Sequence, residues 1–153
     1  MNPLAINRFF LSFGIACLLL LNNPAVAKDQ PQPKLQTVTL SIEGVRLSSE
    51  IASNPNQRYM GLSFRKTLLD NEGMLFVYPE EQALTFTMRN TLLPLSIAYI
   101  SKDFVILEIH DMPVGPGQLF PSKVPAKYAL EVNQGWFERN KIGVGAQITR
   151  ELD

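Results

Sequence analysis

The segment LTFTMRNTLLPLSIAYI, residues 84–100, decides the fold class because its first half alternates between apolar and polar residues. Leu84, Phe86 and Met88 share one register, and threonines stand between them, which is the pattern of a strand with one buried face. Asn90 continues the apolar register shortly before Pro94, so the alternation predicts an amide that faces inward. After the turn at Pro94, residues 94–101 (PLSIAYIS) predict a further strand.

Short segments with strand character recur along the rest of the chain, with turn signals between them. Glu43–Gly44 predicts a hairpin turn between residues 37–42 and 45–52. Further strands are predicted within GMLFVYP (73–79), FVILEIHDM (104–112), KYALEV (127–132) and AQITREL (146–152). Strands this frequent predict a mainly β protein: a compact single-domain β-barrel or sandwich with one or two short helices.

Two segments predict those helices. Asn54 followed by Pro55 is typical of a helix start, with the amide as N-cap and proline in the first turn, so residues 56–65 (NQRYMGLSFR) predict a short helix. Residues 133–143 (NQGWFERNKIG) predict a second helix that stops at Gly143. The proline- and glycine-rich stretch 112–126 predicts a loop, either a plain connection across one end of the fold or a functional segment.

The N-terminus resembles an export signal. Arg8 is the only charged side chain before the apolar run of residues 9–21, and the Ala25–Val26–Ala27 triplet has the small residues of a cleavage site. The run is shorter than the roughly 20 apolar residues that span a bilayer. We therefore predict a signal peptide over residues 1–27, a flexible leader over 28–36 and a single β-rich domain over 37–153, in an exported protein that is periplasmic or secreted.

Two alternatives for the N-terminus are an uncleaved membrane anchor and a lipoprotein acylated on Cys17. Four leucines follow Cys17, which places it inside the apolar run rather than at its end and disfavours the lipoprotein. Cleavage after Ala27 would remove this cysteine, the only one in the chain, and leave no internal disulfide. The 14 basic and 14 acidic residues form no basic block, so we expect no nucleic-acid partner, and no membrane association after cleavage.

No arrangement in the sequence selects a catalytic or metal site. His110 is the only histidine, and a zinc site would need several His or Cys ligands at defined spacing. We expect His110 to be a strand-end surface residue, and we expect no metal and no cofactor. A carboxylate pair could hydrolyse glycosides, but the spacing of the available acids selects none. These acids are Glu43, Glu50, Glu108, Asp111 and Glu131.

The strongest binding hypothesis combines the first predicted helix with the opening segment. Arg58 and Arg65 are seven residues apart and would share a helix face if the helix runs that far. They could clamp a carboxylate or phosphate, or each could pair with a carboxylate of the domain and fix the helix to the sheet. Asn90 could be the polar floor of such a pocket or tie down a turn before Pro94. The predicted ligand-binding residues are Arg58, Arg65, Met88, Asn90 and Thr91.

Five segments together resemble the domain of unknown function 192 family, small prokaryotic proteins often made with an export signal. They are Arg58 with GLSFR (61–65), EGMLFVYP (72–79), MRNTLLPLSIAYI (88–100), YALEVNQGW (128–136) and IGVG (142–145). The resemblance covers roughly residues 38–150 and implies a compact β-barrel or sandwich, without naming a substrate. The chain has Thr87, Ser96 and Ala146 where the family commonly has tryptophan, aspartate and aspartate, so neither aspartate can be an essential catalyst here.

Two function classes follow from these observations. The favoured one is a non-catalytic binding or accessory module of the cell envelope, with a small-molecule or envelope ligand, because no catalytic constellation is visible. The alternative is a small envelope hydrolase that acts on sugar or peptide material through a carboxylate pair. Two carboxylates facing each other across a cleft would favour the hydrolase, and a pocket without such a pair would favour binding.

Overall fold

The computed structural model describes residues 29–115 and 117–151. Most of this part of the chain forms short strands joined by turns, with two short helices. The strands are β1 (Thr37–Ile42), β2 (Val45–Ala52), β3 (Glu72–Gln82), β4 (Thr85–Thr87), β5 (Leu95–Ile100), β6 (Ile106–Met112), β7 (Leu119–Pro121), β8 (Ala126–Asn133) and β9 (Ile148–Arg150). The helices are α1 (Pro55–Met60) and α2 (Trp136–Arg139). The predicted signal peptide lies outside the described residues.

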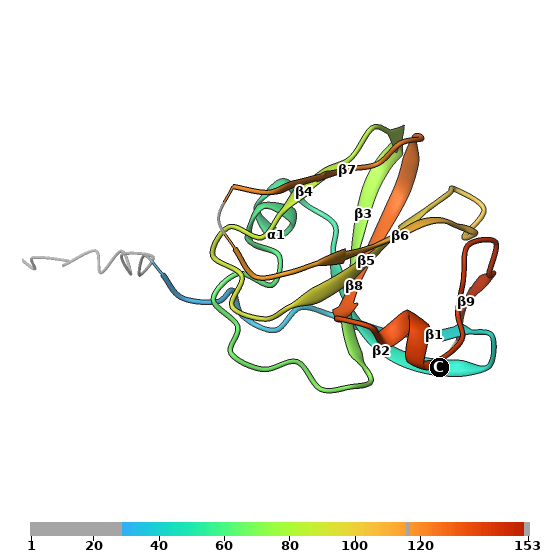
Figure 1. Cartoon of the computed structure of the whole chain (residues 1–153), viewed down its shortest axis with the longest axis horizontal. Helices are drawn as coiled ribbons and strands as arrows, with labels where there is room; N and C mark the ends of the chain where they lie inside the picture. The colour runs from blue at the N-terminus through green and yellow to red at the C-terminus, as the bar shows by residue number, and fades with distance from the viewer. Residues whose placement is uncertain (1–28, 116, 152–153) are drawn as a thin grey trace, which may run out of the picture.

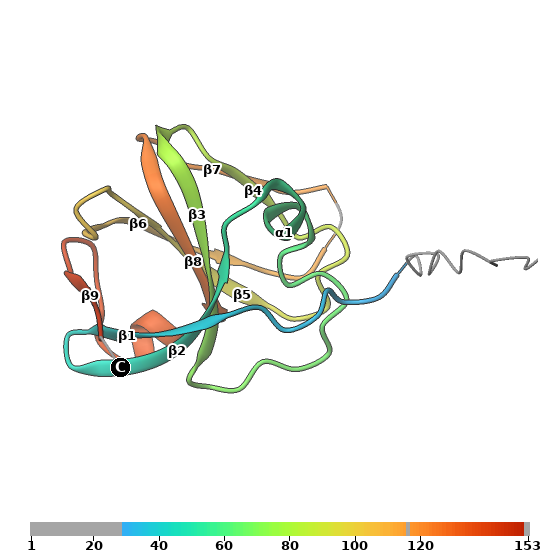
Figure 2. The same ribbon diagram turned by 180° about the vertical axis from the view of Figure 1, so that it is seen from behind.

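One seven-stranded sheet in the order β6-β5-β8-β3-β2-β1-β9 curls into a half-barrel (Figure 1). Strands β2 and β3 pair in parallel because α1 and its following loop carry the chain back between them, and the other neighbours are antiparallel. Strands β4 and β7 form a separate two-stranded sheet. In both views, α1 with β4 and β7 lies toward one side of the molecule and β9 toward the other (Figures 1 and 2). The prediction of a mainly β domain of barrel or sandwich type is confirmed.

The half-barrel buries apolar side chains on both faces. All six residues of β5 are buried, and they alternate between two cores: Ala98 and Ile100 lie in the first, and Ile97 and Tyr99 in the second. The first core includes Trp136 of α2. The second includes residues of β3, β4, β5, β7 and β8. A strand that is buried on both faces needs apolar residues at nearly every position, which explains the largely apolar sequence of β5.

The first hairpin forms where the sequence predicts it. Strands β1 and β2 pair from Thr37 opposite Glu50 to Ile42 opposite Val45. Glu43 and Gly44 form the turn with φ of 50° and 81°. Two consecutive residues at positive φ match the right-handed twist of the flanking strands, which is why a glycine stands at this position.

Both predicted helices exist, and both are shorter than predicted. The Asn54 side chain accepts a hydrogen bond from Gln57 N–H at 2.9 Å, and Gln57 bonds back to the Asn54 N–H, so the predicted cap is confirmed. However, α1 ends at Met60 because Gly61 adopts φ 49°, which breaks the helical backbone. Arg65 therefore lies in the following loop, and the predicted shared helix face of Arg58 and Arg65 is wrong.

The opening segment follows its predicted register only as far as Met88. Leu84, Phe86 and Met88 are buried, and Thr85 and Thr87 between them are exposed. Asn90 is exposed and adopts φ 62° in a turn, so the inward amide is wrong. Its main-chain carbonyl accepts a hydrogen bond from Phe64 N–H at 2.7 Å. Asparagine suits this position because it tolerates the left-handed backbone better than most residues.

Two further segments cover the second core. Within the proline-rich stretch, β7 pairs with β4 alone, at a sheet edge where proline is tolerated. The described part of the leader lacks helix or strand but contacts the domain: Gln32 donates hydrogen bonds to the carbonyls of Gln57 and Gly61. Its flexibility stays a prediction. Among the described residues, no helix is long and apolar enough to cross a membrane.

Candidate functional site

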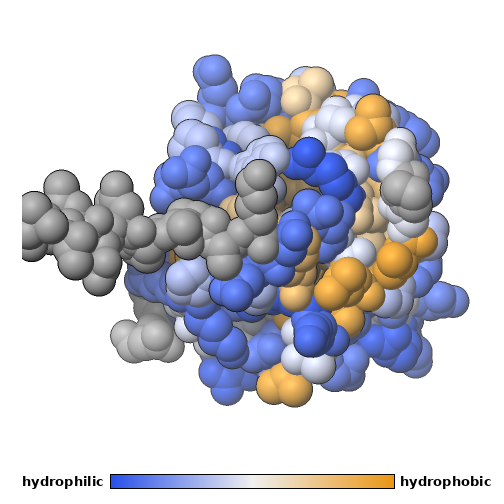
Figure 3. Space-filling model, turned by 90° about the vertical axis from the view of Figure 1, so that its left-hand side faces the viewer, coloured by the Kyte–Doolittle hydropathy of each residue, from blue (hydrophilic) through white to orange (hydrophobic). Residues whose placement is uncertain are grey.

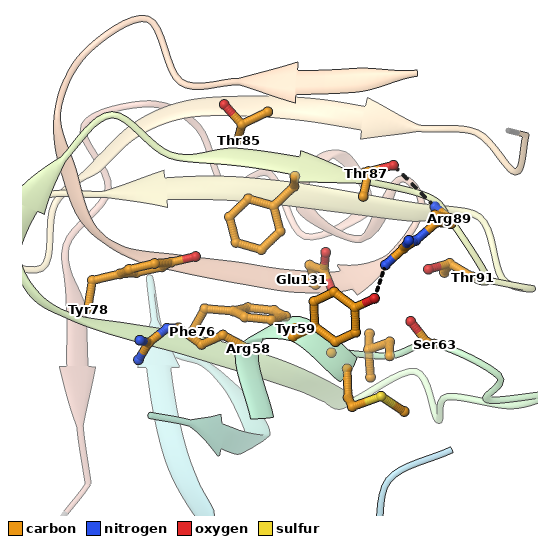
Figure 4. Close-up of a pocket in the computed structure, with 14 residues that line it drawn as sticks. Arg58, Tyr59, Ser63, Phe76, Tyr78, Thr85, Thr87, Arg89, Thr91 and Glu131 are labelled. Carbon is orange, nitrogen blue, oxygen red and sulfur yellow. Dashed lines mark hydrogen bonds between the residues drawn. The ribbon is translucent and has the colours of Figure 1, made fainter. Parts of the chain in front are cut away.

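A pocket of about 190 Å³ lies between α1, β3, β4 and β8 (Figure 4). Its lining combines apolar and polar side chains. The rings of Tyr59, Phe76, Tyr78 and Phe86 form much of the apolar part, and charged and hydroxyl-bearing residues stand around them. The polar members are Arg58, Ser63, Thr85, Thr87, Arg89, Thr91 and Glu131. Figure 3 looks onto the side of the molecule that carries α1, where hydrophilic residues predominate and hydrophobic ones are exposed between them.

Glu131 is the buried acid of this pocket. It stands on β8, an inner strand between β3 and β5, opposite Met74 and Ile97. The residue is only 6% exposed and lines the pocket. Among the described residues its carboxyl oxygens have no protein partner, but they are not fully buried: the fully buried side-chain polar atom without a partner there is Nε of Arg65. Desolvation raises the pKa of Glu131 to about 8, so the group is mainly protonated at neutral pH. An acid with a pKa perturbed in this way beside a pocket is a candidate for function.

Aromatic rings form the wall around this acid. Phe76 and Phe86 meet edge to face, with their centroids 4.9 Å apart. Phe76 is on β3 and Phe86 on β4, so the contact also attaches the small sheet to the large one. Gly61, at the end of α1, lies so close to the Phe76 ring that a side-chain carbon there would be 3.3 Å from it. The glycine thus lets α1 pack directly on the pocket wall.

Arg58 lines the pocket from α1 and is held by main-chain carbonyls. Its Nη1 donates hydrogen bonds to Ser53 O and to Val77 O, the second at 2.9 Å. The guanidinium also lies over the Tyr78 ring, 4.8 Å from its centroid. Burial raises the pKa of Tyr78, with the positive charge of Arg58 opposing that rise. Arg58 therefore fixes α1 to β3 and presents positive charge beside the pocket.

Arg89 and Tyr59 form a second pair at the pocket, from the turn after β4 and from α1. Arg89 Nη2 donates a hydrogen bond to the Tyr59 hydroxyl at 2.5 Å, and its guanidinium lies 5.2 Å from the ring centroid. Both residues are exposed, Tyr59 to 70%. Figure 4 shows this pair bridging α1 and the turn after β4. A contact between two exposed side chains can open with little loss of stability.

The five residues predicted to bind a ligand occupy three different environments. Arg58 and Thr91 line the pocket. Met88 is buried in the second core, and Asn90 is exposed in its turn. Arg65 makes a bidentate ion pair with Glu50, at 2.5 Å and 2.8 Å.

Arg65 pairs with a carboxylate of the domain, which is the second of the two roles that the sequence allowed for it. The pair fixes the loop after α1 to strand β2. Both side chains are about nine-tenths buried. Glu50 also accepts a hydrogen bond from Leu35 N–H at 2.7 Å. Desolvation disfavours the charged form of Glu50, but these hydrogen bonds outweigh it and lower its pKa. This acid is therefore fully partnered, in contrast to Glu131.

His110 lies away from the pocket lining, on β6. Its Nε2 is 3.0 Å from Glu108 Oε2, and its ring packs edge to face on Tyr99. The histidine side chain is 30% exposed, so it is half-buried rather than fully on the surface. Within residues 29–115 and 117–151, no cluster of three His, Cys, Asp or Glu side chains could hold a metal ion.

Sequence reasoning missed Arg89 and Tyr59 and did not single out Glu131. The segment AKYALEVN contains one signal that could have identified the acid: Glu131 is flanked by Leu130 and Val132. An acid inside an apolar run of a strand is almost never buried unless it is paired or functional. No comparable signal marks Arg89 or Tyr59, which meet only in the fold.

Comparison with known proteins places the chain in a family. The profile of DUF192, described as "Uncharacterized ACR", matches residues 38–150. No curated protein matches significantly. A solved structure from Sinorhizobium meliloti 1021, described as a candidate transcription regulator, is 28% identical with a TM-score of 0.73; the match covers 78% of this chain and 97% of that one.

A second solved structure gives a similar result. A protein of unknown function from Novosphingobium aromaticivorans DSM 12444 is 31% identical, with a TM-score of 0.70. The match covers 81% of this chain and 94% of that one. Sequence profile and structures agree over the same domain, and the chain belongs to the DUF192 family.

Proposed function

We propose that the protein is a non-catalytic binding module that takes a small polar molecule into the pocket beneath α1. The observation that carries this proposal is the Glu131 carboxyl, which belongs to a residue only 6% exposed and opens onto the pocket without a protein partner among the described residues. A ligand that hydrogen-bonds to this group would gain a polar contact in a largely desolvated site. The aromatic wall supplies apolar area, as in most small-molecule sites.

Binding is better supported than hydrolysis by the composition of the pocket. Glycoside hydrolysis uses two carboxyl groups about 5–10 Å apart on either side of the scissile bond. Among the fourteen residues that line the pocket, Glu131 is the only acid. Glu50, another acid of the same sheet, is held by Arg65 and Leu35. The hydrolase alternative therefore lacks a second group in this pocket.

A ligand screen tests the proposal. Thermal melting of the purified protein against sugars, organic acids and peptidoglycan fragments should reveal a compound that raises the melting temperature. A ligand at a hundred times its dissociation constant adds about 2.7 kcal/mol of stability. The variant Ser63→Trp, which places a large ring at the pocket lining, should lose this shift, while Thr67→Trp on the exposed loop nearby should keep it. A ligand that stabilises both variants equally would bind elsewhere and contradict the proposal.

We also propose that the protein acts outside the cytoplasm, in the periplasm or as a secreted protein. This proposal rests on the sequence features of residues 1–27. We propose no nucleic-acid partner, because basic residues are not clustered in the sequence.

Mass spectrometry of the exported protein tests the location and the cleavage site together. We expect Lys28 to be the N-terminal residue, because the Ala25–Val26–Ala27 triplet precedes it. A diacylglyceryl adduct on Cys17 would instead make the protein a lipoprotein. Retention of the full-length chain in the cytoplasm would contradict the export proposal altogether.

A further inference from the structure

The geometry points to a two-ended ligand: a small zwitterion that places an ammonium group against Glu131 and an anionic group at Arg89, with Arg58 nearby. This inference rests on the proposed binding function and specifies the chemistry of the ligand. The volume of about 190 Å³ limits its size. A cavity of about 150 Å³ holds benzene, so about six to ten non-hydrogen atoms would fit.

The floor of the pocket favours a cation. Glu131 is a carboxyl at the pocket without an ion-pair partner among the described residues, so an ammonium group would pair with its ionised form. The rings of Phe76 and Phe86 stand at the same pocket. An ammonium group near such ring faces gains cation–π attraction, which strengthens when water is excluded. An acid beside aromatic rings is thus a suitable receptor for an amine.

The rim of the pocket favours an anion. Nη1 of Arg58 donates hydrogen bonds to two main-chain carbonyls, and Nη2 of Arg89 donates one to the Tyr59 hydroxyl. A guanidinium carries five N–H donors, so both arginines have donors left for a ligand. Arg89 is exposed and can turn toward an incoming carboxylate or phosphate with little cost. The Ser63 and Thr91 side chains add hydroxyl groups at the same lining.

The two ends are electrostatically separate. Desolvation by burial is the cause of the raised pKa of Glu131, and no opposing effect of Arg58 or Arg89 accompanies it. Figure 4 shows Glu131 between Arg58 and Arg89, which lie on opposite sides of it. Since neither arginine compensates the acid, one molecule with both charges would satisfy both ends. A simple anion would make no use of the ionised form of Glu131, and a simple amine would make no use of the donors left on the two guanidinium groups.

Binding of an ammonium group should be coupled to loss of a proton. The charged and titratable groups around Glu131 are Arg58 and Tyr59 from α1, Tyr78 from β3, Arg89 after β4 and Tyr99 from β5. Burial raises the pKa of both Tyr78 and Tyr99 above 10, so neither tyrosine titrates near neutrality. Below about pH 8 the ligand must therefore bind with release of the Glu131 proton. Affinity should then rise with pH, by up to about tenfold per unit.

A matched series of linear probes tests the inference by calorimetry on the purified protein. The series comprises ω-amino acids from glycine to 6-aminohexanoate, each compared with the amine and the carboxylate of the same chain length. We expect one or two adjacent ω-amino acids to bind at least tenfold more tightly than their amine or carboxylate partners. Their affinity should rise between pH 6 and 8, with about one proton released per ligand in buffers of different ionisation enthalpy.

Two variants assign the two ends. Glu131→Gln should abolish the pH dependence and weaken the best probe at least tenfold. Arg89→Gln should reduce the zwitterion to the affinity of the simple amine and leave the proton release intact.

Three results would overturn the inference. One is a carboxylate that binds as tightly as the zwitterion, or with affinity that falls as pH rises through 8, since Glu131 would then act as a protonated donor to an anion. A second is tight binding that Glu131→Gln leaves unchanged. A third is no binding across the series while another compound in the wider screen binds at the pocket, which would refute the zwitterion and keep the binding function. Absence of any pocket-dependent ligand in the wider screen would refute the binding function itself.

Discussion

Replacing Arg65 with methionine should lower the free energy of unfolding by about 3–5 kcal/mol, because removal of one partner leaves a buried charge uncompensated. The guanidinium makes two hydrogen bonds to Glu50 at 2.5 Å and 2.8 Å, and both side chains are close to 90% buried. Domains of this size are stable by only about 5–15 kcal/mol, so the loss is a large share of the total. Urea unfolding of the two proteins measures the difference.

The pH dependence of this loss has a definite direction. The hydrogen bonds from Arg65 and Leu35 lower the pKa of Glu50 below its usual value of 4.5 despite burial. A lowered acid pKa contributes stability that is present above pH 4.5 and is lost as pH falls through the pKa of the folded protein. The gap between wild type and Arg65→Met should therefore be largest above about pH 5 and shrink in acid.

Two controls separate a buried pair from a surface one. Lys66→Met changes the exposed neighbour in the same loop and should alter stability by less than about 0.5 kcal/mol. The double variant Glu50→Leu/Arg65→Met removes both charges and should recover most of the loss. If Arg65→Met lowered the free energy of unfolding by less than about 1 kcal/mol, the pair would contribute no more than an exposed ion pair does. That result would contradict the role of Arg65 in fixing the loop to the sheet.

The fold could be predicted from the sequence because its signals are local. Alternation, turn residues and the Asn54–Pro55 cap act within a few residues, and each predicts its element where the structure has it. The length of α1 could not be predicted, because the chain leaves the helix at Gly61 to pack against Phe76, a contact set by the distant strand β3. The pairing of β4 with β7 was also missed: the alternation of residues 84–88 predicts β4, but β7 lies in the proline-rich stretch that predicts a loop.

The site was less predictable because it assembles from segments far apart in the sequence. Arg58 and Thr91 were identified from the sequence and do line the pocket. Asn90 continued an alternation that ended two residues earlier, and a single turn was enough to expose its side chain. For Arg65 the sequence allowed either a ligand or a carboxylate partner, and only the fold brings Glu50 to it.

Replacing Glu131 with glutamine should have the opposite effect to the loss of Arg65. Glu131 and Glu50 both stand opposite Met74, from β8 and β2 on its two sides, but Glu131 forms no ion pair with any described residue. Burial raises the pKa of Glu131 from 4.5 to about 8, so the folded state binds a proton that the unfolded state has released. Stability therefore falls as pH rises from about 4.5 to about 8. Glutamine has a similar shape and no charge, so this loss should disappear.

We expect the stability of Glu131→Gln to match wild type near pH 4.5 and to exceed it by on the order of 3–5 kcal/mol at pH 8, since one pKa unit corresponds to about 1.4 kcal/mol. Urea unfolding at intervals between these pH values measures the difference. Glu80→Gln, an exposed acid on β3, serves as the control and should track wild type throughout. A difference that stays flat with pH would mean that a cation or water already compensates Glu131. A stability difference that rises with pH would mean that the fold keeps an acid at its pocket although this acid destabilises it. A role in ligand binding explains why such an acid is kept, whereas a role in stability does not.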